Sequence, residues 1–227
     1  MVDPWSENER LAAEKLTLGL FLTGHPINQY EAEIRQFTHG TIASLQAEVE
    51  RSRGNMSARV AGLVVEVRTR QTKQGKNMGF ATLDDRTGRL EIAAFSDTYE
   101  KYRDIFYRDN LLVAEGSLGV DDYLGTLRLT IERLYNMEQA REAFARSIQL
   151  SWNAATTEQG SSEFISKLNA VLKPFRGGTC PISLIYISEK AQTTLQMGDE
   201  WRVNPTDELI SRLKWLLGGH SVTIKYK

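Results

Sequence analysis

The sequence is poor in residues that form covalent or metal cross-links. Its 227 residues include one cysteine, Cys180, and three histidines, His25, His39 and His220, which lie in separate segments. A single cysteine excludes an internal disulfide and agrees with a reducing compartment. Because zinc sites need clustered Cys and His ligands, we predict no metal site and expect no cofactor.

Long apolar runs and an excess of either charge are also missing. The longest apolar stretches, such as residues 16–22 and 181–187, are too short to span a bilayer, and the N-terminus lacks the basic-then-apolar layout of a signal peptide. We therefore expect a cytoplasmic protein without a membrane segment. Lys and Arg total 28 against 29 Asp and Glu, so attraction to a polyanion has to come from a local cluster.

Few carboxylates stand side by side in a context that suggests catalysis. There are two such pairs, Asp84 with Asp85 and Asp121 with Asp122, and the second aspartate of each lies three residues before a glycine. Aspartates in such positions typically accept hydrogen bonds from the N–H groups of the turn, so we interpret both pairs as turn caps. The glycines around Lys76 lack the Walker spacing of a phosphate-binding loop. No catalytic residue and no nucleotide site is predicted.

The middle of the chain, residues 57–136, alternates between apolar and polar positions and predicts five strands. Three strands, a helix over the 96–110 segment and two further strands make the order of the oligonucleotide-binding (OB) barrel. Gly62 would let the long first strand coil sharply enough to serve two parts of a barrel. An unrelated small β-sandwich is the alternative. The predicted strands are residues 58–70, 78–84, 89–95, 111–120 and 126–135.

The flanking segments complete an α+β chain with three parts. Residues 1–56 predict helices, one opened by a capping box at Ser6 and Glu9 and one over residues 26–37, followed by a polar linker at 47–57. Residues 137–227 predict a separate small α+β domain. Its expected elements are helices at 137–146, 161–172 and 207–217, a turn at 173–178, and strands at 147–152, 180–188, 192–197, 200–203 and 221–226.

Positive charge gathers where the first predicted strand ends and the next loop begins. No acidic residue occurs between Val67 and Leu83. In OB folds this loop and the face of the second and third strands contact oligonucleotides. Aromatic side chains nearby can stack on bases, although an aromatic on a barrel strand is commonly core and a basic loop is commonly just solvated. The predicted nucleic-acid contacts are Arg68, Arg70, Lys73, Lys76, Asn77, Phe80 and Tyr123.

In the C-terminal domain, Trp201, Arg202 and Trp215 are residue types enriched at the centres of protein interfaces. We predict that they bind a partner. The alternative is that both tryptophans belong to the core, because a domain this small needs large apolar side chains inside.

Several segments carry a resemblance to a known family. LGLFLTGHPINQY (residues 18–30) and TLDDRTGRLEIAAF (residues 82–95) resemble the C-terminal part of the α subunit of bacterial DNA polymerase III. WRVNPTDELISRLKWLLG (residues 201–218) and SVTIKY (residues 221–226) resemble the extreme C-terminus of the same family. The resemblance covers essentially the whole chain. The barrel segment alone also resembles the anticodon-binding domain of class II aminoacyl-tRNA synthetases.

The polymerase resemblance implies a non-catalytic piece of a DNA-directed DNA polymerase, because the family's catalytic palm lies upstream. It implies a barrel near single-stranded DNA, with the Arg68 to Lys76 loop toward the strand, and a tail domain that binds the τ subunit of the clamp loader. The family's sliding-clamp motif has no match, and the last strand begins at Ser221 where some relatives have Gln, so clamp binding is not expected. A protein-interaction module or a tRNA-binding appendage are the alternatives.

Overall fold

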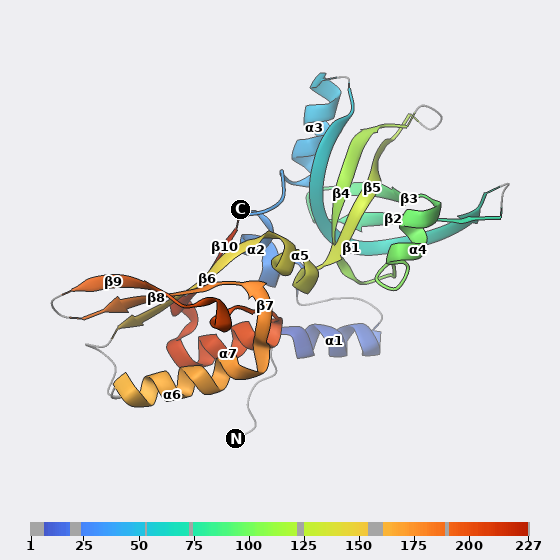
Figure 1. The fold of residues 1–227 in the computed structure, drawn as a ribbon. Coiled ribbons are helices and arrows are strands. Elements are labelled where there is room, and N and C mark those ends of the chain that lie inside the picture. The colour runs from blue at the N-terminus through green and yellow to red at the C-terminus, as the bar shows by residue number, and fades with distance from the viewer. Residues whose placement is uncertain are drawn as a thin grey trace. The chain divides into compact units, whose positions relative to one another are not determined.

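The computed structural model describes residues 7–18, 24–52, 54–72, 75–121, 125–153, 161–188 and 191–226. The chain divides into two compact units, residues 1–136 and 137–227, which Figure 1 shows as a barrel-containing part and a second sheet with helices. Each unit has its own cluster of buried apolar side chains. Ser6 of the predicted capping box lies outside the described residues.

The first unit contains a closed barrel of five strands in the order β1-β2-β3-β5-β4. The β3–β5 pair is parallel and the other pairs are antiparallel. This is the OB topology that the order of the predicted elements indicates, and the alternative of a β-sandwich is wrong. The strands are β1 (Met56–Gln71), β2 (Asn77–Asp84), β3 (Arg89–Ala94), β4 (Leu111–Val120) and β5 (Leu127–Asn136).

The long strand β1 serves two neighbours. Its first half, residues 56–63, pairs with β4, and its second half, residues 63–71, pairs with β2. Gly62 lies where one pairing gives way to the other. A Cβ atom on Gly62 would lie 3.0 Å from the Cβ of Leu83 and 3.2 Å from the backbone N and O of Asp84. The missing side chain therefore allows the close approach of β2 that closes the barrel.

Two helical segments contribute to the barrel core. The segment between β3 and β4 begins with α4 (Ser96–Tyr102) and buries Phe106 after it, as the helical spacing predicts. A Cβ on Gly79, at the start of β2, would lie 2.2 Å from the ring of Tyr99, so the α4 segment packs closely on this end of the strand. Helix α3 (Ile42–Ser52) adds Ile42 to the same core and approaches the β2–β3 turn at Gly88.

The predicted linker at residues 47–57 is wrong. Helix α3 continues through it to Ser52, and β1 begins at Met56. Ile42, Leu45 and Val49 are at most 2% exposed and follow the spacing of three and four that defines one helical stripe. The charged residues between them form the solvent side of the helix, and these residues make the composition resemble a linker.

The other N-terminal helices agree in part with their prediction. Helix α1 is described over Glu7–Leu18. The helix expected at 26–37 is instead a 3-10 turn, η1 (Asn28–Tyr30), followed by the single α-turn α2 (Glu31–Ile34). Its predicted apolar stripe is confirmed at Ile27, Ile34 and Phe37, which are buried.

The second unit is a four-stranded sheet in the order β10-β6-β8-β9, with helices packed on it (Figure 1). Strands β6 and β8 are parallel, so the chain crosses over between them through α6. Helix α7 begins at the N-cap Thr206, whose hydroxyl accepts from the Leu209 N–H at 3.2 Å, and ends at Gly218, which has φ of 89°. The elements are α5 (Met137–Phe144), β6 (Ala145–Asn153), α6 (Ser161–Leu172), η2 (Lys173–Phe175), β7 (Arg176–Cys180), β8 (Ile182–Ile187), β9 (Gln192–Gln196), η3 (Asp199–Trp201), α7 (Asp207–Leu217), η4 (Gly219–Ser221) and β10 (Val222–Tyr226).

Two details of this unit differ from the prediction. The strand expected at 200–203 is the 3-10 turn η3, and only Val203 forms isolated bridges, to Arg176 and Cys180. The turn expected at 173–178 includes the start of β7. A Cβ on Gly178 would lie 2.1 Å from the carbonyl carbon of Val203, so the glycine-rich sequence that suggests a turn permits a tight backbone crossing.

Candidate nucleic-acid interface

The outward faces of β1 and β2 carry three of the predicted contact residues, Arg68, Arg70 and Phe80. Lys76 lies in the loop between the two strands, and Asn77 begins β2 with its side chain directed toward Glu100 of α4. Arg68 pairs with Phe80, and Gln71 with Asn77, across the two strands. On β2 the alternate residues Gly79, Ala81 and Leu83 point into the barrel, which places Phe80 on the outside. Lys73 and Tyr123, also predicted as contacts, lie outside the described residues.

Phe80 is not a core residue. Its ring is half-buried and lies near two arginines, with the guanidinium carbon of Arg70 5.9 Å and that of Arg128 5.4 Å from the ring centroid. Such contacts stabilise the arginines by about 0.5–1 kcal/mol each at an exposed site. The interpretation of Phe80 as a barrel-core aromatic is therefore wrong, and its ring belongs to a cationic outer surface.

A chain of ion pairs crosses this surface from β1 to β5. Arg68 pairs with Glu91 of β3, and the same carboxylate lies 2.6 Å from Nη2 of Arg128. Arg128 also pairs with Asp121, and its side chain is only 14% exposed. Sequence reasoning missed Glu91 and Arg128, because they lie 37 positions apart and meet only through the parallel β3–β5 pairing.

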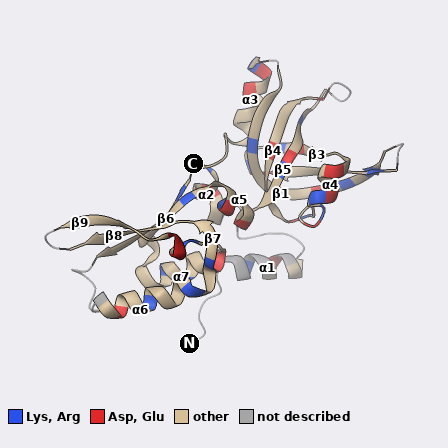
Figure 2. Ribbon diagram, viewed as in Figure 1, with Lys and Arg blue, Asp and Glu red and all other residues tan. Residues whose placement is uncertain are grey.

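Carboxylates of α4 approach the loop after β1. Nζ of Lys76 lies 3.1 Å from Oδ1 of Asp97, and Nδ2 of Asn77 lies 3.4 Å from Oε1 of Glu100. In Figure 2, red and blue segments lie next to each other around α4. The basic stretch that is free of acids in the sequence is thus partly neutralised in the fold. Among the described residues, Arg70 has no acidic partner.

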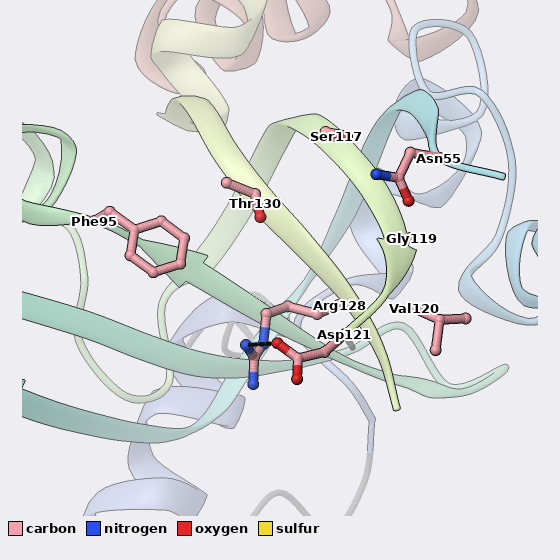
Figure 3. Close-up of a pocket in the computed structure, with 8 residues that line it drawn as sticks. All are labelled: Asn55, Phe95, Ser117, Gly119, Val120, Asp121, Arg128 and Thr130. Atoms are coloured by element: carbon pink, nitrogen blue, oxygen red, sulfur yellow. Dashed lines mark hydrogen bonds and ion pairs between the residues drawn. The ribbon is translucent and has the colours of Figure 1, made fainter. Parts of the chain in front are cut away.

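A cleft of about 110 Å³ opens beside Arg128 on the outer side of β4 and β5 (Figure 3). Phe95, at the end of β3, forms one side of it and is 42% exposed. It is a second outward aromatic, and no sequence pattern marks it. The cleft is lined by Asn55, Phe95, Ser117, Gly119, Val120, Asp121, Arg128 and Thr130.

The first aspartate pair is a structural turn, as predicted. Oδ1 of Asp85 accepts from the N–H of Thr87 at 2.9 Å and of Gly88 at 3.1 Å, while Oδ2 accepts from the Ile42 N–H at 2.8 Å. Burial raises the pKa of Asp84, but the hydrogen bonds from the Arg86 N–H and the Arg89 guanidinium outweigh it and the pKa is lowered overall. The lowered pKa keeps the Asp84 carboxylate ionised as a partner of Arg89.

Of the second aspartate pair the structure describes only Asp121, so the predicted turn cap stays a prediction. The Asp121 carboxylate reaches Arg128 on β5, while Asp122 lies outside the described residues.

Among the described residues, no group of three or more Asp, Glu, His or Cys could hold a metal ion, and no helix has the length and apolarity to cross a membrane. Burial raises the pKa of Cys180 to about 11, so the thiol is neutral at physiological pH.

The three predicted partner contacts of the second unit have different surroundings. Trp201 packs against the unit's core, and the guanidinium carbon of Arg176 lies 3.7 Å from its ring centroid. Arg202 donates to Oδ1 of Asp199 at 2.8 Å and to the carbonyl of Thr179 at 3.0 Å. Trp215, in contrast, is 88% exposed on α7. The alternative that both tryptophans belong to the core therefore holds in part for Trp201 and is wrong for Trp215.

Strand order and outward residues define the class of the first unit as an OB barrel with a basic, aromatic outer face, joined to a small α+β unit. Family models agree: residues 58–137 match the OB-fold nucleic acid binding domain, and residues 167–218 match the domain described as DNA polymerase III subunit alpha, C-terminal domain. The chain is similar in sequence to the C-terminal region of bacterial DNA polymerase III α subunits.

The curated relatives extend this similarity over nearly all of the chain. It is 38% identical over 223 residues to DNA polymerase III subunit alpha of Escherichia coli K12, which is 98% of this chain and 19% of the relative. With the Pseudomonas aeruginosa subunit the identity is 39% over 219 residues, 96% of this chain and 18% of the relative. The chain thus spans about a fifth of the length of these relatives.

Solved structures give a weaker likeness. The single-stranded DNA-binding (SSB) protein domain from Synechococcus has a TM-score of 0.32 and 18% identity, covering 35% of this chain and 93% of that one. The single-stranded DNA-binding protein from Thermus aquaticus has a TM-score of 0.31 and 23% identity, covering 35% of this chain and 39% of that one. The barrel assignment rests on the strand order and the family model.

Proposed function

We propose that this chain binds single-stranded DNA through the outer face of its barrel, as a part of a replicative DNA polymerase α subunit. One observation carries the proposal: Arg70, exposed and without an acidic partner among the described residues, lies over the outward ring of Phe80. A cation for the phosphate beside a flat ring for the base is the combination that single-strand binding uses. The homology to polymerase α subunits supports DNA as the ligand.

The charge pattern predicts weak, salt-sensitive binding. The chain as a whole has a formal charge of −1, so no long-range field attracts DNA. Several cations on the face are already paired with Glu91, Asp97 and Asp121. A phosphate has to compete with these carboxylates, and each cation it engages releases counterions from the strand.

A titration of labelled single strands at several salt concentrations tests this proposal. Replacing Arg70 and Lys76 together with alanine should weaken binding and reduce the salt slope by about one for each phosphate that the variant no longer neutralises. The matched control replaces Arg35 and Lys167, exposed cations that each pair with a glutamate four residues earlier on their helix. Absence of binding by the wild type at low salt, or an unchanged slope in the double variant, would reject the proposal.

We further propose that the second unit binds the τ subunit of the clamp loader through a surface that includes Trp215. Its support is the family match of residues 167–218 and the almost fully exposed indole on α7. Tryptophan is the residue type most typical of interface hot spots, where truncation costs at least about 2 kcal/mol. Arg202 and the edge of Trp201 remain further candidates for this surface.

A pull-down with the τ subunit tests the second proposal. Trp215→Ala should abolish capture, whereas Leu195→Ala, which truncates another exposed apolar side chain on β9, should keep it. Equal capture by wild type and Trp215→Ala would reject the assignment. Capture of τ by a chain that binds no single strand would favour the protein-interaction module over the DNA-binding part.

We assign no polymerisation to this chain and expect no cofactor, no sliding-clamp binding and a cytoplasmic location. Primer extension with the chain alone and Mg²⁺ should yield no product, and any extension would contradict this.

The tRNA alternative requires preference for an anticodon stem-loop over a plain DNA strand. A competition titration between the two distinguishes them.

A further inference from the structure

The cleft between Phe95 and Asn55 has the chemistry of a site for an uncharged, flat ligand. Arg128 is the cation in it, and it is held by two carboxylates, Glu91 and Asp121. Arg68 shares Glu91 with Arg128, so two guanidinium groups face two carboxylates and the group has no net positive charge to attract a phosphate. An anion would have to break these charge-assisted bonds, which are among the strongest hydrogen bonds in proteins.

The remaining lining groups are neutral and available. The side chains of Asn55, Ser117 and Thr130 have no hydrogen-bond partner among the described residues, and together they offer an amide and two hydroxyls. In Figure 3, Phe95 lies on one side and Asn55 on the other, with Thr130 between them and the paired Arg128 and Asp121 below. An aromatic face and hydrogen-bonding groups are thus presented to the same space.

Gly119 of β4 leaves room for the Asn55 amide at this cleft. A Cβ atom on Gly119 would lie 1.8 Å from Oδ1 of Asn55, so any larger residue would displace the amide from its place in the cleft. Because the clashing atom is the end of a flexible side chain, the displacement would cost little folding stability. A substitution of Gly119 by alanine should therefore alter the cleft without disrupting the barrel.

We infer that this cleft is a nucleobase subsite: one unpaired base of the bound strand stacks on Phe95 and presents its edge to Asn55, Ser117 and Thr130. The inference rests on the proposed single-strand binding and divides the surface into two parts. Arg70 and Lys76 contact the phosphates, and the cleft holds a base. The charge of the cleft selects a base rather than a phosphate, and the exposed ring provides the stacking surface.

Fluorescence anisotropy with labelled strands of about 16 nucleotides, normal or with abasic sites, tests this. Phe95→Ala should bind the normal strand roughly tenfold more weakly, as expected from removal of one base–aromatic stack. Its affinity for the abasic strand and its salt slope should match the wild type, since the phosphates keep all their cations. Gly119→Ala should weaken binding in the same base-dependent way. Tyr107→Ala, which removes an exposed aromatic outside the cleft, is the control.

The outcomes separate this inference from the proposed function. If the wild type binds strands but Phe95→Ala and Gly119→Ala bind normal and abasic strands as the wild type does, the subsite is wrong and single-strand binding stands. If the wild type binds no strand at low salt, the proposed function fails first. Deoxyadenosine monophosphate at an equal nucleotide concentration should not displace the strand. Displacement would make the cleft a mononucleotide site and overturn its assignment to a base within a strand.

Discussion

Glu91 holds two arginines of the barrel surface. Its carboxylate accepts from Arg68 and from Arg128, so one side chain engages two of the cations on the face. Glu91 is 18% exposed, which keeps solvent screening of these pairs low. A phosphate can reach either arginine only by replacing a partner that is already in place.

Replacing Glu91 with glutamine should therefore strengthen single-strand binding. The amide keeps the size and one acceptor oxygen but removes the negative charge that competes with the strand. We expect a severalfold lower Kd at fixed salt and a salt slope steeper by about one for each cation released to the DNA. The measurement is the anisotropy titration, with Glu208→Gln as control, because Glu208 forms an exposed ion pair with Arg212 on α7 of the second unit. A Kd that is unchanged or higher for Glu91→Gln would contradict this competition between carboxylate and phosphate.

At the scale of single residues, the sequence predicts which side chains carry charge. It does not predict which of them form ion pairs within the fold and which can still bind a ligand. The stretch without acids points to Arg68 and Lys76, yet Glu91 and Asp97 reach them from β3 and α4. Local sequence cannot contain this information, because only the barrel closure brings these strands together. The outward position of Phe95 is not predictable for a related reason. A single aromatic residue at the end of a strand belongs to no alternating pattern that would assign its side chain to the outer or the inner face.

Elements with a strict alternation are predictable from the sequence. On β2 every second residue is buried, and the predicted strand at 78–84 agrees with the observed Asn77–Asp84 within one residue. Helix α3 is hard to predict because its stripe is sparse and its outer face is highly charged. Strand β7 is hard to predict because it pairs only through bridges to Val203 and carries two glycines, which disfavour regular strands.

The contact between α3 and the β2–β3 turn depends on one carboxylate. Asp85 accepts hydrogen bonds from the Ile42 N–H at the start of α3 and from Thr87 and Gly88 in its own turn. Asp85→Ala leaves several of these donors unpaired and should lower the free energy of unfolding by about 1–3 kcal/mol. Urea denaturation measures this change in the free energy of unfolding. Asp104→Ala, which truncates an aspartate that is 94% exposed, should change stability by less than about 0.5 kcal/mol. Similar destabilisation in both variants would show that the cap is not the cause.

The whole molecule is built as two cores that share no residue. One cluster joins α3, the α4 segment and the barrel strands, and the other joins α6, α7 and the second sheet. The order of the barrel strands is predictable, because strand-helix-strand spacing is specific for the OB topology. The order β10-β6-β8-β9 is not, because it depends on a parallel crossover whose partners are far apart in sequence and carry no local register signal.

Separate cores predict separate unfolding. Leu83 in the barrel and Leu150 in the second sheet are both fully buried, so Leu→Ala at either site should cost about 2–5 kcal/mol in its own unit. Native-state hydrogen exchange of the full chain measures this unit by unit. In Leu150→Ala, protection should fall on β6, β8 and β10 and stay unchanged on β1 to β5, and Leu83→Ala should show the reverse, because neither cavity touches the other cluster. Protection that falls in both units for either variant would mean that the two cores unfold as one. The DNA-binding and τ-binding proposals would then have to be tested as coupled properties rather than as those of independent domains.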